Sequence, residues 1–303
     1  MISLASQISQ EPIVTDPIIS IRGATKRFGR KAALDGVDVD LPAGSVTGLV
    51  GVNGSGKSTL LHALVGLIRL DAGSCRIRDA DSANLPPEIK ADLGWAPQKP
   101  DLLGHLRVRD LLSFTATFYR GWDNSLAADL LHRFELDPLV RAASLSLGQQ
   151  QRLALVLALA HRPSVLVLDE PAASLDPLAR REALAELTRA AADGATILIS
   201  THLVSDLARL ADRLVILDRG RVRWTGAVDD LLESTKRLRL HRAEGVPVDL
   251  VLPGQRHRQT DGAHAQITVH GDVAAAMAIA RSAGCDVTVD DLGLEDAVLE
   301  VVK

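Results

Sequence analysis

The sequence is poor in cysteine and carries no excess of positive charge. Its two cysteines, Cys75 and Cys285, lie far apart and without Cys-x-x-Cys spacing, which argues against a disulfide framework and a zinc site and fits a reducing compartment. The formal net charge of -4 lacks the basic field of a general nucleic-acid binder, although residues 236–242 form a local basic run. We therefore expect a cytoplasmic protein and no nucleic-acid partner.

Long apolar runs are also missing. The most apolar stretch, residues 153–160 (LALVLALA), is bounded by Arg152 and His161 and is much shorter than the roughly 20 residues that span a bilayer. The N-terminal residues lack a charged region followed by an apolar one, so we expect no secretory signal peptide. Any membrane association should come through another protein.

The composition is that of a folded protein, with 47 % hydrophobic and 24 % charged residues. A chain of 303 residues is long enough for one large core and a smaller unit. We expect a lead-in over residues 1–17, a large domain over 18–235 and a compact α+β appendage over 236–303.

Apolar patterning predicts an α/β fold in which strands and helices alternate. The C-terminal region reads as strand, strand, helix, strand, helix. A hairpin is expected over 215–226, with Gly220 in its turn. The other predicted strands cover residues 18–22, 37–41, 45–51, 164–170 and 195–202, and the predicted helices cover 59–68, 177–192 and 204–211, with a helical region over 110–135.

Residues 51–59, GVNGSGKST, match the P-loop pattern G-x-x-x-x-G-K-[ST] and stand between a predicted strand and a predicted helix. Glycines let backbone amides converge on phosphate oxygens at the positive end of the helix. Lys57 supplies a charge to the β and γ phosphates, Ser58 a hydroxyl to Mg²⁺, and Thr59 a phosphate or backbone contact. The residues predicted to hold ATP here are Gly51, Asn53, Gly54, Ser55, Gly56, Lys57, Ser58 and Thr59.

The stretch VLVLDE supplies the carboxylates that such a loop needs. Asp169 ends a predicted buried strand, where it can bind Mg²⁺ directly or through water. Glu170 stands one residue further out and can accept a proton from the attacking water or hold that water in line. Together these motifs predict hydrolysis of a nucleoside triphosphate.

Residues 145–152, LSLGQQQR, resemble the LSGGQ signature of ATP-binding cassette proteins and stand just before VLVLDE, as in that family. The resemblance covers roughly residues 18–233 in the family's motif order. It implies a P-loop NTPase core with an antiparallel β subdomain and a helical insertion at about 99–150. It also implies that ATP and Mg²⁺ are bound, with roles for Phe28 (adenine stacking), Gln98 (metal and γ phosphate), Ser146, Gly148, Gln149, Asp176 and His202 (γ phosphate).

Several of these residues have structural alternatives. Gln98 fits an ordinary loop amide, His202 a helix cap or a core histidine, Asp176 a helix cap before Pro177, and Phe28 a core position. Leu147 replaces the first glycine of the signature, and we expect this change to be tolerated.

The resemblance further implies that two cassettes close head to tail, as a homodimer or with a sister subunit. It also implies a separate transmembrane permease that holds the chain on the inner face of the cell membrane. The short insertion and the ending LGLEDAVLEVV look like bacterial drug-export and self-resistance cassettes. The alternative is a non-transport ATPase that acts as a clamp or regulator on another macromolecule.

The chain has four Phe, three Trp and one Tyr, and five of these eight aromatic residues fall in the predicted helical insertion. The resemblance implies that this insertion receives the membrane subunit. Phe114 and Phe118 are spaced i, i+4, and Tyr119 and Trp122 could rim a groove. Packing within the insertion explains the same rings. Trp122 is expected to be the exposed one, because GWDN resembles a turn.

Overall fold

The structure, a computed structural model, describes residues 17–302. The lead-in predicted over 1–17 lies outside the described residues, apart from Pro17. Within the described chain the strands form three sheets, and the α/β class is confirmed. No helix in residues 17–302 is long and apolar enough to cross a membrane.

The central sheet has six strands in the order β10-β9-β3-β8-β7-β6 and is parallel except for β10. Strands β3, β7 and β8 are buried along their whole length, which explains their continuous apolar sequences. Because the carboxyl ends of parallel strands share one edge, the segments after β3, β7 and β8 meet there. The strands are β3 (Val46–Val50), β6 (Leu93–Ala96), β7 (Val165–Asp169), β8 (Thr196–Thr201), β9 (Arg213–Asp218) and β10 (Arg221–Ala227).

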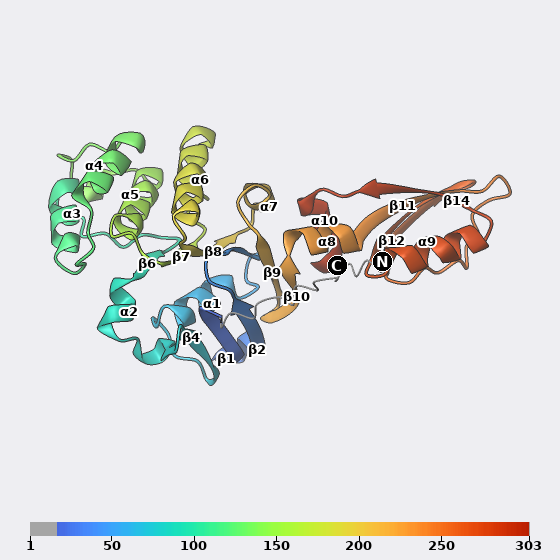
Figure 1. Cartoon of the computed structure of the whole chain (residues 1–303), viewed down its shortest axis with the longest axis horizontal. Coiled ribbons are helices and arrows are strands. Elements are labelled where there is room, and N and C mark those ends of the chain that lie inside the picture. Colours follow the sequence, from blue (N-terminus) through green and yellow to red (C-terminus); the bar gives the residue numbers. More distant parts are fainter. Residues whose placement is uncertain (1–16, 303) are drawn as a thin grey trace, which may run out of the picture.

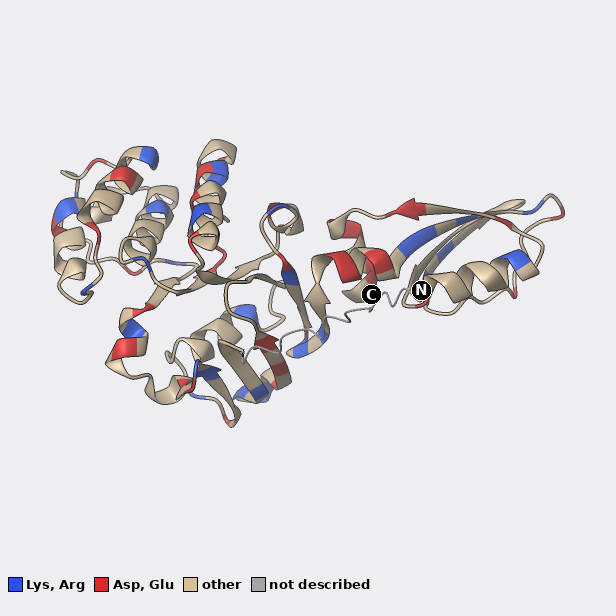
Figure 2. Cartoon of the chain, viewed as in Figure 1, with Lys and Arg blue, Asp and Glu red and all other residues tan. Residues whose placement is uncertain are grey.

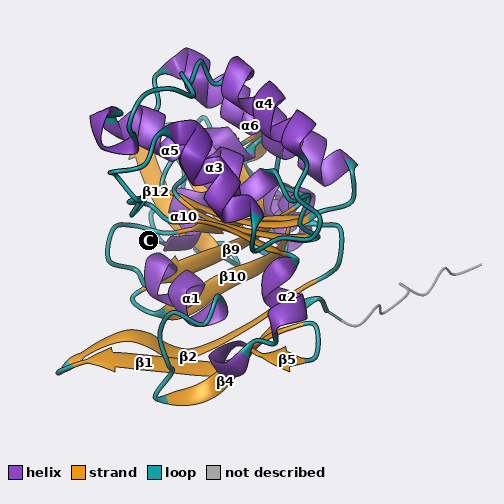
Figure 3. Ribbon diagram, turned by 90° about the vertical axis from the view of Figure 1, so that its left-hand side faces the viewer, coloured by secondary structure: helices purple, strands orange, loops and turns teal. Residues whose placement is uncertain are grey.

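An antiparallel sheet in the order β2-β1-β4-β5 packs with helix α1 (Lys57–Leu64) against one side of the central sheet. Figure 3 shows this sheet below α1, β9 and β10. Its first two strands are longer than predicted because register shifts let the β1–β2 hairpin continue past its polar positions. The strands are β1 (Ile19–Phe28), β2 (Lys31–Leu41), β4 (Ala72–Ile77) and β5 (Ala80–Asp81).

The helix expected over 59–68 is present, but it begins at Lys57 and ends at Leu64, before Gly66, which has a φ of 78°. The prediction of a turn over the next residues was wrong. Ala72 and Gly73, expected in a turn, begin β4. A Cβ at Gly73 would lie 2.3 Å from the carbonyl oxygen of Gly23, so this glycine allows β4 to approach β1.

Helices cover the other face of the central sheet, and the insertion is helical as predicted. Phe134 is fully buried in their shared core. The chain also contains two short 3₁₀ turns. One, Ser82–Asn84, lies next to β4 and α1, and the other, Ala142–Ser144, comes shortly before α5. The helices on this face are α3 (Val108–Ala116), α4 (Asn124–Arg133), α5 (Leu147–Leu159), α6 (Pro177–Ala192) and α7 (Val204–Leu207). The short helix α2 (Pro87–Ala91) lies instead on the side of α1, where Ile89 packs against the core that α1 shares with the antiparallel sheet. Figure 1 shows α3, α4 and α5 at one end of the molecule.

The third sheet lies at the opposite end of the molecule, with strand order β12-β13-β11-β14 (Figure 1). Helix α9 (Val273–Ser282) covers one face and closes a separate apolar core. Strand β12 was not predicted, because its sequence QRHRQTD is polar throughout and forms a sheet edge. The strands are β11 (Thr235–His241), β12 (Gln255–Asp261), β13 (His264–His270) and β14 (Asp286–Asp291).

Two helices join the third sheet to the rest of the chain. Helix α8 (Val228–Ser234) continues from β10, and α10 (Leu294–Val302) packs against α7, α8 and β9. Leu294, Ala297 and Val298 of α10 belong to the same apolar cluster as the helices of the large domain. The division at 235/236 stays a prediction. Figure 2 shows positive and negative residues interspersed, with acidic residues on α8 and basic ones on the adjoining β11.

Candidate active site

The loop GVNGSGKST joins β3 to α1, as predicted. Gly56, the residue before α1, has a φ of 114°, and a Cβ there would lie 2.4 Å from the carbonyl oxygen of Ala33. A Cβ at Gly51 would lie 2.5 Å from the Ser55 hydroxyl. Both positions therefore require glycine, one for backbone conformation and close approach, the other for the tight fold of the loop.

Lys57 lies at the bottom of this loop and is only 5 % exposed. Its Nζ donates to the carbonyl oxygens of Gly51 (2.7 Å) and Val52 (3.4 Å) and lies 3.8 Å from Oε1 of Glu170. Burial lowers the pKa of Lys57, and the Glu170 carboxylate partly opposes that shift. A buried ammonium with carbonyl partners and one distant carboxylate is a binding point for a further anion.

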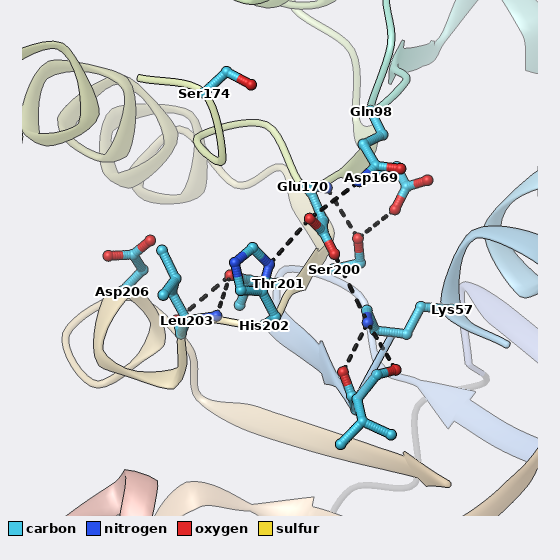
Figure 4. A network of polar contacts seen from close by, with 12 residues as sticks. Lys57, Gln98, Asp169, Glu170, Ser174, Ser200, Thr201, His202, Leu203 and Asp206 are labelled. Atoms are coloured by element: carbon cyan, nitrogen blue, oxygen red, sulfur yellow. Dashed lines mark hydrogen bonds and ion pairs between the residues drawn. The ribbon is translucent and has the colours of Figure 1, made fainter. Parts of the chain in front are cut away.

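Glu170 is the centre of the polar network shown in Figure 4. Its Oε2 accepts a hydrogen bond from Gln98 Nε2 (3.2 Å) and lies 3.0 Å from Nδ1 of His202. Its backbone has a φ of 47°, a left-handed conformation that is unfavourable for glutamate. The backbone N–H is held by the carbonyl oxygen (3.1 Å) and hydroxyl (2.9 Å) of Ser200, which stabilises this conformation.

Asp169 is 1 % exposed, and its Oδ1 accepts a hydrogen bond of 2.5 Å from the hydroxyl of Ser200. Ser200 therefore holds the carboxylate of Asp169 through its hydroxyl proton and the backbone N–H of Glu170 through its two oxygen atoms. The sequence analysis missed this serine. The available signal was its position near the end of β8, beside β7, which places it against Asp169.

A cavity of about 420 Å³ opens over the loop. Phe28 lies at its edge and is 56 % exposed, so it is not a core residue. Lys31 and Ala33, which were not predicted, line it because β2 begins directly across the hairpin from Phe28. The predicted residues that line it are Phe28, Asn53, Gly54, Gly56, Lys57, Ser58, Thr59, Gln98 and Glu170.

The remaining predicted residues do not line the cavity. Gly51 and Ser55 are buried within the loop, while Asp169 and His202 contact Ser200 and Glu170. Asp176 caps α6 by accepting hydrogen bonds from the backbone N–H groups of residues 178 and 179, and these bonds lower its pKa. Asp176 is therefore the helix cap that the sequence allowed as an alternative. Its role in nucleotide binding stays a prediction.

The signature segment begins helix α5 outside the cavity. Ser146 and Gln149 form a capping box in which each side chain bonds the other's backbone N–H. Leu147 is 51 % exposed, so its side chain enters no packed interior. A Cβ at Gly148 would lie 3.0 Å from the carbonyl oxygen of Ser174, which shows how closely α5 approaches that loop.

One prediction about the aromatic residues was wrong. Trp122 is partly buried against the helical core, whereas Phe114 and Phe118 are 47 % and 64 % exposed. The two phenylalanine rings pack edge to face, with centroids 5.2 Å apart. Tyr119 stacks on His161 at 3.9 Å, so it packs the insertion against the end of α5.

Comparison with known proteins agrees with this geometry. Residues 34–173 match the model of the ABC transporter family. The daunorubicin resistance ATP-binding protein DrrA3 of Streptomyces coeruleorubidus is 35 % identical over 227 residues, which are 73 % of this chain and 72 % of that protein. The chain belongs to the ABC transporter family. It is an ATP-binding and ATP-hydrolysing subunit.

Other members of the family show the range of transport. The Nod factor export ATP-binding protein I of Burkholderia orbicola is 37 % identical and covers 71 % of this chain and 73 % of its own length. The sulfate/thiosulfate import ATP-binding protein CysA of Mycobacterium tuberculosis is 36 % identical, but the match spans 71 % of this chain and only 63 % of that protein. A dimeric ATP-binding cassette bound to ADP and Pi superposes with a TM-score of 0.63 at 25 % identity, over 69 % of this chain and 98 % of that one.

Proposed function

We propose that this ABC ATPase works as a dimer of cassettes that drives a separate membrane permease, for export. The chain would act in the cytoplasm, on the inner face of the membrane that holds its permease. The proposal is carried by one observation: the groups predicted to contact ATP lie in two separate places, which we call half-sites. The cavity holds Lys57 and Glu170, while Ser146 and Gly148 stand outside it on α5.

ATP would occupy the 420 Å³ cavity, with its adenine on the exposed ring of Phe28 and its phosphates on the loop. The phosphates would take over Lys57 Nζ from the carbonyl oxygens of Gly51 and Val52, to which it now donates. This exchange replaces neutral acceptors with anionic ones, which form stronger hydrogen bonds.

The residues present fit Mg²⁺ held partly by the nucleotide. No cluster of three or more His, Cys, Asp or Glu within residues 17–302 could hold a metal ion by itself. Asp169 is nevertheless a buried carboxylate next to Glu170 in the chain, and Ser58, Gln98 and Glu170 line the ATP cavity. One carboxylate with phosphate oxygens and neutral oxygens is typical Mg²⁺ coordination, and the ion would neutralise phosphate charge.

Glu170 would hold the attacking water in line and accept its proton. Gln98 and His202 already contact the same carboxylate oxygen and would orient it. When ATP binds, its phosphates would draw Lys57 away from Glu170. His202, which lies beside the same carboxylate, would then contact the γ phosphate. Replacing Glu170 with Gln keeps the shape and removes the proton acceptor, so ATP should be bound without being hydrolysed.

Head-to-tail dimerisation would bring Ser146 and Gly148 of one copy to the ATP of the other. A hydroxyl and a backbone N–H at the start of α5 then complete the anion site, and Gln149 and Asp176 would lie at the same interface. The test is size-exclusion chromatography of the Glu170→Gln variant. It should elute as a dimer with ATP and Mg²⁺ and as a monomer without them. A monomer under both conditions would refute the dimer of identical cassettes and leave a sister subunit to be sought.

Phe114 and Phe118 are the rings on the insertion that would meet a permease, because they are exposed and adjacent. Phe118→Ala should reduce co-purification with a multi-span protein encoded next to this chain. The matched control is Phe28→Ala, which removes an equally exposed ring at the nucleotide cavity.

The name of the Nod factor export protein supports export, and so does the drug-resistance name of DrrA3, while the name of CysA supports import. ATP-dependent uptake of a cytotoxic compound into inside-out vesicles that contain both subunits would support export. Uptake by right-side-out vesicles would show import. ATP hydrolysis without any permease would favour the alternative of a clamp or regulator, although the formal net charge of -4 disfavours a nucleic-acid partner.

A further inference from the structure

Gln151 of α5 is almost fully buried, with 2 % exposure, and none of the roles assigned above uses it. A buried amide is costly unless its donors and acceptor are satisfied. Gln151 satisfies them with three different segments. Its Nε2 donates to the carbonyl oxygens of Gln98 and Glu170 at 3.3 Å each, and its Oε1 accepts from the N–H of Ser174 at 3.1 Å.

These partners belong to the two half-sites. The carbonyl groups of Gln98 and Glu170 fix the backbone from which both side chains reach into the ATP cavity of the same copy. Ser174 lies in the loop before Asp176, next to Gly148, which would face the ATP of the other copy. The side chain of Gln151 therefore joins these three backbone groups through its hydrogen bonds.

We propose that Gln151 is a positioning residue that couples the two ATP sites of the dimer. When the partner copy presses on the start of α5 and on the 174–176 loop, the amide transmits the shift to the backbone of Gln98 and Glu170. The carboxylate then reaches its hydrolytic position only after closure. This inference rests on the proposed dimer.

The test replaces Gln151 with Met, which has a similar length and volume but cannot make the three hydrogen bonds. The kcat for ATP should fall at least tenfold, more than any change in KM, because the P-loop and Phe28 are untouched. In the Glu170→Gln background, Gln151→Met should raise at least threefold the ATP concentration that gives half-maximal dimer. The matched control is Gln150→Met. Gln150 is the neighbouring glutamine, and its amide reaches only the carbonyl oxygen of Leu145.

A second variant guards against a simple folding defect. Gln151→Glu keeps an oxygen for the N–H of Ser174 and loses the donor to Gln98 and Glu170, so kcat should fall as much as for Met. A kcat within twofold of wild type in either folded variant would overturn the inference, as would equal changes in kcat and KM with a lowered unfolding midpoint. If the Glu170→Gln protein does not dimerise with ATP, the proposed dimer fails instead, and with it this coupling.

Discussion

Replacing Gly56 with alanine tests how the nucleotide cavity is built. An L-residue with positive φ costs about 1–2 kcal/mol. At Gly56, with a φ of 114°, the new Cβ would also lie 2.4 Å from the carbonyl oxygen of Ala33, a contact that β2 must relieve by moving away. Because Lys31 and Ala33 line the cavity, that movement separates the β1–β2 hairpin from the loop.

ATP would contact both the β1–β2 hairpin and the loop. Binding would therefore pull the hairpin of the Gly56→Ala variant back toward the loop and restore the close contact that the free variant relieves. A restored cost of about 1.4–2.8 kcal/mol corresponds to a roughly tenfold to hundredfold weaker affinity. Equilibrium titration with ATP measures it directly. The control is Gly36→Ala in β2, where φ is 73° but no atom lies within 4 Å of the new Cβ. That variant should lose stability and keep its ATP affinity. Equal affinities for the two variants would refute the close-approach argument.

Further substitutions test the rest of the site. Ser200→Ala should lower kcat/KM about tenfold and the unfolding free energy by about 2 kcal/mol, since Asp169 loses a charge-assisted hydrogen bond. ATPase assays and urea unfolding measure the two quantities, and Ser200→Thr should restore both of them. Leu147→Gly should change ATPase activity about twofold or less, whereas Gly148→Asp should abolish the ATP-dependent dimer in size-exclusion runs of the hydrolysis-deficient protein. Burial lowers the pKa of His161, so the unfolded state takes up the proton first and the unfolding free energy should fall as pH drops below about 6.5. Urea unfolding at several pH values should show a flatter decline for His161→Phe, which keeps the ring stack.

The sequence predicted the parts of the site that follow strand ends. Lys57 and Glu170 come after β3 and β7, and parallel strands bring such segments to one edge without further information. The resemblance added Gln98 and His202, both of which the structure places against Glu170.

What the sequence did not reveal depends on contacts between distant positions or on burial. Ser200 and Gln151 stand in ordinary strand and helix patterns, and only the packing of β8 on β7 and of α5 on the loops gives their polar groups partners. Strand β12 has no apolar alternation because it is an edge. Trp122 follows a turn, yet its ring folds back on the helical core.

The C-terminal region is structurally coupled to the ATPase even though its sequence carries no motif. Helix α10 packs on α7, the helix that begins two residues after His202, and its Ala297 shares a core with Leu207 and Leu231. Without α10 the apolar side of α7 would face water, so the loop that holds His202 against Glu170 would lose support. The third sheet is thus attached through α8 at one end and α10 at the other. Because α10 contacts both that sheet and α7, it connects the third sheet by direct packing to the helix that follows His202.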